Sequence, residues 1–172
     1  MAPLEQKWRT TVTIFSGQSI MRRRPIVDPQ PRTEAEADGQ RFTYGCSPAG
    51  YDLRLDRVKG AYQLGEHLWR LDPGEFALAS TIEEFQMPPD LLGVVHDKSS
   101  WARRGLACQN TVIEPGWRGF LTLELTNHSR EPLCLRQGVG ICQVIFHLLD
   151  EPTFHPYDGV YQDQAAGPQE AR

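Results

Sequence analysis

Several polar side chains between residues 96 and 127 have types and a spacing suited to binding a phosphorylated small molecule. Lys98-Ser99-Ser100 and Arg103 combine positive charge with hydroxyl groups, and Glu114 and Glu124 follow within the same stretch. Ordinary strands and turns do not require these residues so close together in an otherwise apolar frame. We therefore expect an anionic small-molecule site here.

A short helix is expected over Ser99 to Arg104, with Ser99 or Asp97 as its N-cap. The free amides at a helix start favour an anion, so this end of the helix is a candidate phosphate contact. The alternative is that Lys98, Arg103 and Arg104 only solvate a surface helix.

Glu124 belongs to a strand-like run, Phe120 to Thr126, in which apolar and polar residues alternate. Leu121, Leu123 and Leu125 then share one face of the strand, and Glu124 lies on the other face with its threonine neighbours. From spacing alone, Glu124 is expected to be exposed to solvent. The preceding residues, Gly105 to Arg118, are expected to form a hairpin.

The rest of the chain repeats short strand-like runs separated by Gly, Pro and Asp residues, which predicts an all-β sandwich or barrel. In Tyr51 to Leu55 the alternation indicates a strand on which Asp52 and Arg54 share a face and form salt bridges. The other runs are 67–71, 76–80, 91–95, 133–135 and 141–149.

These motifs, in this order, resemble the dCTP deaminase branch of the dUTPase-like superfamily. The resemblance covers about residues 44 to 167 and rests on Lys98–Leu106, Ile113–Gly119, Leu123–Leu125, Gly50–Leu55, Asp72–Glu75, Tyr157 and Tyr161–Gln164. It implies a mainly β, dUTPase-like distorted β-barrel or jelly roll with a few short helices. The expected organisation is an N-terminal segment packing on the core (1–40), a β core (41–152) and a C-terminal tail (153–172) that closes over the site and is disordered after Gly167.

The resemblance also implies a hydrolase that deaminates a deoxycytidine nucleotide without a metal, converting dCTP to dUTP and ammonia in pyrimidine deoxynucleotide metabolism. Glu124 would be the catalytic base and acid, and Ser99 and Arg103 would orient water and stabilise developing charge. The family further implies a homotrimer with active sites shared between subunits. The expected substrate contacts are Lys98, Ser100, Thr111, Val112, Glu114, Trp117, Tyr157, Tyr161 and Gln164.

Two departures from the deaminase pattern keep other functions open. The connection Ala107 to Val112 is about two residues shorter and resembles that of dUTPases, and Val160 replaces the usual lysine of the tail. A dUTP diphosphatase with Glu114 as base, a bifunctional enzyme and a non-catalytic nucleotide-sensing module are the alternatives. The residues do not determine how many phosphates the substrate carries, or whether its cytosine has a substituent on C5.

No zinc site is expected, because the H-x-E and P-C-x-x-C signatures of zinc deaminases do not occur and the five histidines lack ligand spacing. Magnesium would only accompany the triphosphate, held mostly by phosphate oxygens. The four cysteines have no close paired spacing, which favours reduced, structural thiols over disulfides.

Composition limits the remaining classes of function. A chain of 172 residues with net charge -4 lacks the basic footprint of a nucleic-acid-binding protein. It has no apolar run of about 20 residues and no signal-peptide pattern, so we expect no membrane partner and a cytoplasmic location. A strand is expected at Thr10 to Phe15, and Arg22-Arg23-Arg24 is interpreted mainly as solvated surface.

Overall fold

The computed structural model describes residues 13–37 and 39–171. Strands dominate this described part, and its helices are short. In chain order the elements are β1 (Thr13–Ile14), α1 (Gly17–Arg23), β2 (Thr33–Ala37), β3 (Gln40–Ser47), β4 (Gly50–Lys59), β5 (Tyr62–Gly65), β6 (Leu68–Leu71), β7 (Phe76–Gln86), β8 (Leu91–Asp97), α2 (Ser99–Ala102), β9 (Leu106–Cys108), β10 (Val112–Ile113), β11 (Arg118–Asn127), β12 (Leu133–Arg136) and β13 (Gly140–Leu148).

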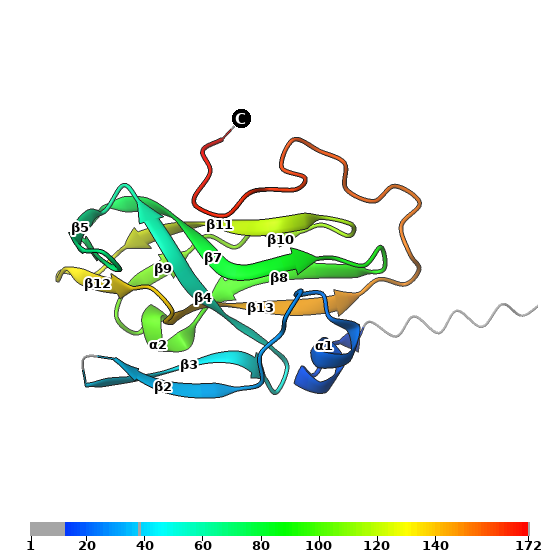
Figure 1. Cartoon of the computed structure of the whole chain (residues 1–172), viewed down its shortest axis with the longest axis horizontal. Helices are drawn as coiled ribbons and strands as arrows, with labels where there is room; N and C mark the ends of the chain where they lie inside the picture. Colours follow the sequence, from blue (N-terminus) through cyan, green and yellow to red (C-terminus); the bar gives the residue numbers. More distant parts are fainter. Residues whose placement is uncertain (1–12, 38, 172) are drawn as a thin grey trace, which may run out of the picture.

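Most strands belong to one 10-stranded sheet (Figure 1). Its main strand path has the order β10-β8-β13-β4-β7-β11-β9. Off this path, β1 pairs with β13, and β3 pairs with both β2 and β4. Strand β4 connects the two halves, because Asp52 pairs with Gln143 of β13 while Leu55 pairs with Thr81 of β7. A smaller sheet, β12-β6-β5, lies at one end. The predicted mainly β architecture is therefore confirmed.

Strand β11 alternates as its sequence predicts. Leu121, Leu123 and Leu125 are buried in the core, whereas Thr122 and Glu124 are half-buried on the opposite face. Antiparallel pairing with β7 on one side and β9 on the other holds the strand, and Glu124 lies opposite Leu78. The same alternation that builds the core thus presents Glu124 on the other side of the sheet.

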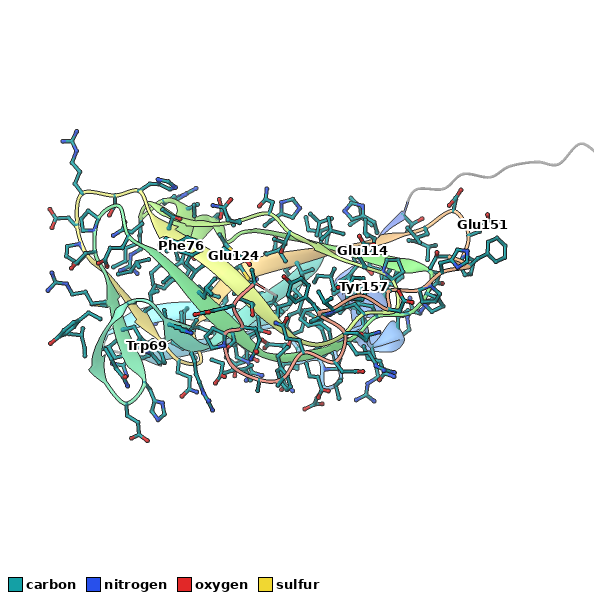
Figure 2. All side chains as sticks on the ribbon, turned by 90° about the horizontal axis from the view of Figure 1, so that it is seen from above. Trp69, Phe76, Glu114, Glu124, Glu151 and Tyr157 are labelled. Carbon is teal, nitrogen blue, oxygen red and sulfur yellow. The ribbon has the colours of Figure 1, made fainter. Side chains whose placement is uncertain are left out.

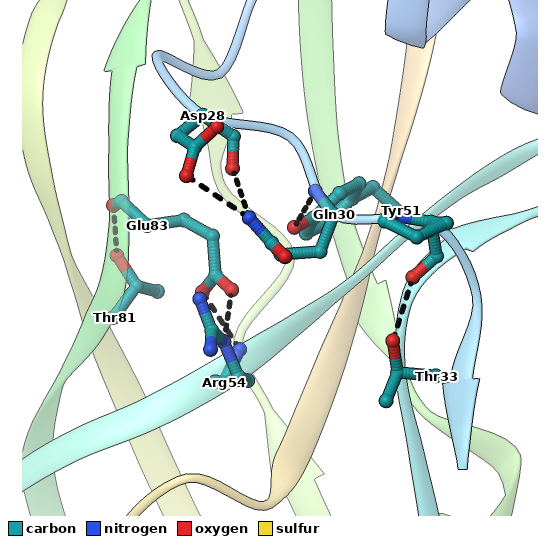
Figure 3. Close-up of polar contacts among 8 residues, drawn as sticks. Asp28, Gln30, Thr33, Tyr51, Arg54, Thr81 and Glu83 are labelled. Atoms are coloured by element: carbon teal, nitrogen blue, oxygen red, sulfur yellow. Dashed lines mark hydrogen bonds and ion pairs between the residues drawn. The ribbon is translucent and has the colours of Figure 1, made fainter.

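Two buried or half-buried ion pairs connect β4 to β7 and to Lys98, the residue that follows β8. Glu83 accepts hydrogen bonds from Arg54 Nε at 2.7 Å and from the Arg54 amide at 2.8 Å (Figure 3). Asp52 accepts from Lys98 Nζ, which also donates to Thr43 at 3.0 Å. The predicted salt bridges of Asp52 and Arg54 are confirmed, each with a partner far away in the sequence.

The described residues before β2 cover one end of the sheet. Ser16 caps α1 by accepting from the Ser19 amide, and Ile20 is fully buried. Arg23 pairs with Asp90 at 2.6 Å and is exposed, as expected for a surface cluster. The strand expected at Thr10 to Phe15 is observed at Thr13–Ile14, and residues 10–12 lie outside the described residues.

The hairpin expected over residues 105–118 is wrong. Strand β9 pairs with β11 and β10 pairs with β8, at opposite ends of the main strand path. The short connection therefore spans the two halves of the curled sheet.

The expected capping of α2 is also wrong, because Lys98 is the N-cap and provides no side-chain bond. The Asp97 carboxylate instead accepts from the Cys108 amide at 2.7 Å, which ties β8 to β9. Neither described helix is long and apolar enough to cross a membrane.

The cysteines of the structure are free, as the sequence predicts. Cys46, Cys108 and Cys142 are buried, and Cys134 is exposed on β12. A hydrogen bond with Cys108, together with burial, raises the pKa of the Cys142 thiol, and burial raises that of Cys46. The Cys46 and Cys142 thiols are therefore packing groups rather than reactive thiolates.

Candidate active site

A cavity of about 700 Å³, which we call the Glu124 cavity, lies between the β7–β11 surface and the C-terminal tail. In Figure 2 Glu124 lies between Phe76 and Glu114, and Tyr157 lies next to Glu114. Most of the predicted site residues line this cavity. The lining residues are Phe76, Leu78, Thr111, Val112, Ile113, Glu114, Trp117, Leu121, Thr122, Glu124, Tyr157, Tyr161, Gln164, Gln169, Glu170 and Ala171.

Glu124 has the environment of a proton-transfer group. Its Oε2 atom is buried and has no hydrogen-bond partner among the described residues. Burial raises the pKa of the Glu124 carboxyl, and a hydrogen bond with its own backbone lowers it to a smaller extent. A raised pKa brings a carboxyl group closer to neutral pH, where it can both accept and donate a proton.

The connection from β10 to β11 forms the rim of the cavity beside Glu114. The Trp117 amide donates to the Glu114 carbonyl at 3.1 Å, which closes a turn around Pro115 and Gly116. Gly116 has φ 86°, and a Cβ there would lie 2.5 Å from Pro156 of the tail. The turn therefore requires glycine, and it leaves the Glu114 side chain exposed at the rim.

Thr111 and Val112, which come just before Glu114 in the chain, also line the cavity. The Thr111 carbonyl accepts from the Val95 amide at 3.0 Å. Val112 belongs to β10, the strand at one end of the main strand path, and pairs with Val94 of β8. The Thr111 carbonyl is thus already bonded within the protein, whereas the Val112 side chain is 52% exposed.

Tail residues form the roof of the cavity. The Trp117 indole donates to the Tyr161 carbonyl at 2.7 Å, and the Tyr161 amide donates to the Tyr157 hydroxyl at 3.3 Å. Gln164 is only 7% exposed, and its amide nitrogen donates to the Phe120 carbonyl and to Thr122 Oγ1, both at 2.8 Å. Much of the polar surface expected to contact a nucleotide therefore also holds the tail in place.

The sequence predicts disorder after Gly167, and the structure describes residues 168–171 of this segment. The Gln169 amide donates to Thr122 Oγ1 at 3.0 Å, and Glu170 pairs with Lys59 at 2.5 Å. These contacts place the end of the tail against β4 and β11. Arg172 lies outside the described residues.

The remaining predicted residues lie elsewhere. Lys98, Ser99 and Ser100 line a second cavity of about 530 Å³, which we call the Ser99 cavity, together with Arg32, Thr43, Ser47, Pro48, Ala49, Asp52, Asp97 and Gln143. Arg103 is exposed at the end of α2 and lines neither cavity. The two cavities share no lining residue, so one chain does not bring Glu124 together with Ser99 and Arg103.

Sequence reasoning did not single out several residues of the Glu124 cavity. Phe76 and Leu78 come from β7, and only the strand pairing with Thr126 and Glu124 shows that they belong here. Thr122 could have been found, because the alternation of β11 puts it on the same face as Glu124. Gln169 carries no sequence signal that we recognise.

The described residues contain no group of three His, Cys, Asp or Glu side chains able to hold a metal ion. A magnesium ion that arrives with a triphosphate does not require such a group, because phosphate oxygens and water supply most of its ligands.

Comparison with known proteins agrees with the fold and the motifs. A family model described as dCTP deaminase-like matches residues 63–149. The dCTP deaminase of Pyrococcus horikoshii is 40% identical over 120 residues, which cover 67% of this chain and 77% of that protein.

Solved structures show the same fold. The 2'-deoxycytidine 5'-triphosphate deaminase of Agrobacterium tumefaciens aligns with TM-score 0.59 and 17% identity over 80% of this chain, which corresponds to only 48% of that chain. The native dUTPase of EIAV aligns with TM-score 0.50 and 21% identity over 77% of this chain and 95% of its own. The predicted dUTPase-like fold is thus confirmed, and the chain belongs to the dCTP deaminase-like family.

Proposed function

We propose that this protein is a hydrolase that converts dCTP and water to dUTP and ammonia. The observation that carries the proposal is Glu124, a carboxylate with a buried, unbonded oxygen and a raised pKa inside a cavity of about 700 Å³. Names of family members, such as the dCTP deaminase of Pyrococcus horikoshii, support the choice of substrate.

The chemistry requires water to attack C4 of cytosine, a proton to reach ring N3, and ammonia to leave. Glu124 would take a proton from the water while the water oxygen forms its bond to C4. Glu124 would then pass that proton to ring N3. The remaining proton of the attacking water then moves to the departing amino group, and the C4–N bond breaks. One carboxyl group with a raised pKa can perform these transfers in sequence because it is neither a strong acid nor a permanently charged base.

Ser99 and Arg103 would complete the site from a second subunit of a homotrimer. Supporting this proposal, Ser99 is exposed in its own cavity. Arg103 is also exposed, and its guanidinium group forms no hydrogen bond or ion pair with another residue of the described part. Across an interface these groups can orient the attacking water and stabilise developing charge. Lys98 and Ser100, beside Ser99, would then face the phosphates.

Mixing two inactive variants tests the shared site. Glu124→Gln and Ser99→Ala are each expected to be inactive as pure oligomers. After co-refolding or co-expression, about a quarter of the sites would combine an intact Glu124 with an intact Ser99, so activity should return. A mixture that assembles but stays inactive would contradict sharing between subunits.

Product analysis tests the activity itself. The protein is incubated with magnesium and, separately, dCTP, dCMP, their 5-methyl forms and dUTP, and the products are separated by chromatography. dUTP and ammonia from dCTP are the expected result. Turnover restricted to a monophosphate or to a 5-methyl substrate would replace the proposed substrate within the same chemistry.

A second candidate, dUTP diphosphatase activity, is favoured by the exposed Glu114 at the rim of the cavity and by the dUTPase-like fold. In this reaction water attacks phosphorus, with magnesium on the phosphates and Glu114 as base. The same assay detects it as dUMP and pyrophosphate, either alone or alongside deamination in a bifunctional enzyme. For either activity, we propose that the protein acts in the cytoplasm.

A further inference from the structure

The tail lies along β11 of its own chain, held by backbone as well as side-chain contacts. Gly119 and Gln164 form a parallel bridge, and the Phe120 amide donates to the Gln164 carbonyl at 3.0 Å. Gly119 has φ 131°, and a Cβ there would lie 2.6 Å from the Gln164 nitrogen. The close approach of the tail is therefore built into β11 by a residue without a side chain.

The Thr122 side chain on β11 binds the tail at two separate points. Its Oγ1 accepts from Gln164 Nε2 at 2.8 Å and from the Gln169 amide at 3.0 Å. A hydroxyl oxygen has two lone pairs, so these donors use both. Thr122 also shares its face with Glu124 and lines the same cavity.

The two ion pairs between the tail and the body of the protein are weaker anchors. Arg118 pairs with Asp163 at 2.9 Å and Lys59 pairs with Glu170 at 2.5 Å, but all of these side chains are more than half exposed. Exposed ion pairs contribute little, because water screens them. By contrast, the largely buried Gln164 amide would lose one of its two acceptors if Thr122 lost its oxygen.

We propose that Thr122 is a positioning residue that holds the tail over the Glu124 cavity, and so sets the affinity for the nucleotide. The inference rests on the proposed function, since it takes the nucleotide to bind in this cavity. Tyr157, Tyr161 and Gln164 form its roof, so a tail that detaches from Thr122 removes one wall of the binding site. Glu124 itself stays on the sheet and keeps its surroundings on β7 and β11.

Thr122→Val and Thr122→Ser form a matched pair of variants. Valine keeps the shape and removes the acceptor oxygen, whereas serine keeps the oxygen. Loss of two hydrogen bonds predicts a KM for dCTP raised by about tenfold in Thr122→Val, with kcat within about threefold of wild type. Thr122→Ser should remain within about twofold of wild type in both constants.

Hydrogen exchange of the full chain, measured without added nucleotide, reads tail anchoring independently of turnover. Thr122→Val should speed exchange of the amides of residues 164–171 by about tenfold, and Thr122→Ser should not. Gln169→Pro removes one donor without touching β11, and should speed exchange over the last residues only. Lys59→Ala, which breaks an exposed ion pair, is the control and should change neither exchange nor KM by more than about twofold.

These measurements distinguish a failure of the proposed role of Thr122 from a failure of the proposed function. Wild-type exchange and KM in a folded Thr122→Val would overturn the role of Thr122, and so would a higher kcat/KM, which would mean that the tail obstructs the cavity. If the wild type does not deaminate dCTP, the proposed function fails. The exchange data then decide alone whether Thr122 anchors the tail.

Discussion

Glu83 and Glu124 are carboxylates on neighbouring strands, β7 and β11, with opposite surroundings. Glu83 accepts from both the side chain and the amide of Arg54, whereas Glu124 Oε2 has no partner among the described residues. Burial raises the pKa of both groups, but Arg54 opposes this effect at Glu83. The carboxylate that stabilises the fold accepts a hydrogen bond at each of its two oxygens. A carboxylate that exchanges protons with a substrate must instead keep one oxygen without a protein partner.

The largest expected effect is the loss of activity in Glu124→Gln. Glutamine keeps the size of the side chain but cannot shuttle a proton, so kcat for dCTP should fall by at least about a thousandfold. Ammonia release measures turnover, and calorimetric titration with dCTP should show that binding persists. An active Glu124→Gln protein would rule out the mechanism.

Glu83→Ala should chiefly affect stability. It leaves Arg54 half-buried without its partner, which predicts a loss of about 3–5 kcal/mol in the free energy of unfolding by urea. Asp90→Ala breaks the exposed pair with Arg23 and should cost less than about 1 kcal/mol. Similar losses in the two variants would show that the Arg54–Glu83 pair does not anchor the fold.

The pH dependence of kcat/KM should report the raised pKa of Glu124. The carboxyl must be ionised to accept a proton from water, so activity should fall as pH decreases through that pKa. The acid limb is therefore expected above the ordinary glutamate value of about 4.3. A limb at or below that value in a pH–rate profile would contradict a desolvated Glu124.

The smallest expected effect is a gain of stability in Glu124→Gln. Because the pKa of Glu124 is raised in the folded chain, wild-type protein is most stable with this group protonated and loses that stability as pH rises through the folded pKa. At pH 7 the variant should melt about 2–4 °C higher than wild type. The difference should vanish when both are compared in acid well below the ordinary glutamate pKa, and an equal gain at all pH values would point to packing instead.

Local pattern was sufficient where one face of a strand is buried. The alternation in β4 and β11 correctly predicted which residues enter the core, and the motif order correctly indicated the family. Pattern was insufficient for the connection between β9 and β10. Its two short strands look like the arms of a hairpin, but they bind strands from different halves of the curled sheet.

The sequence by itself determined the alternating core strands such as β4 and β11, the reduced cysteines and the kinds of side chain available for the chemistry. These features follow from residue type and from a period of two along a strand. Tertiary structure decided which of those side chains meet. Pairing of β7 with β11 brings Phe76 and Leu78 to Glu124, and the tail brings Gln164 and Gln169 to Thr122. It also placed Ser99 in a different cavity from Glu124. Contacts between distant segments depend on sheet order and curvature, which no local pattern records.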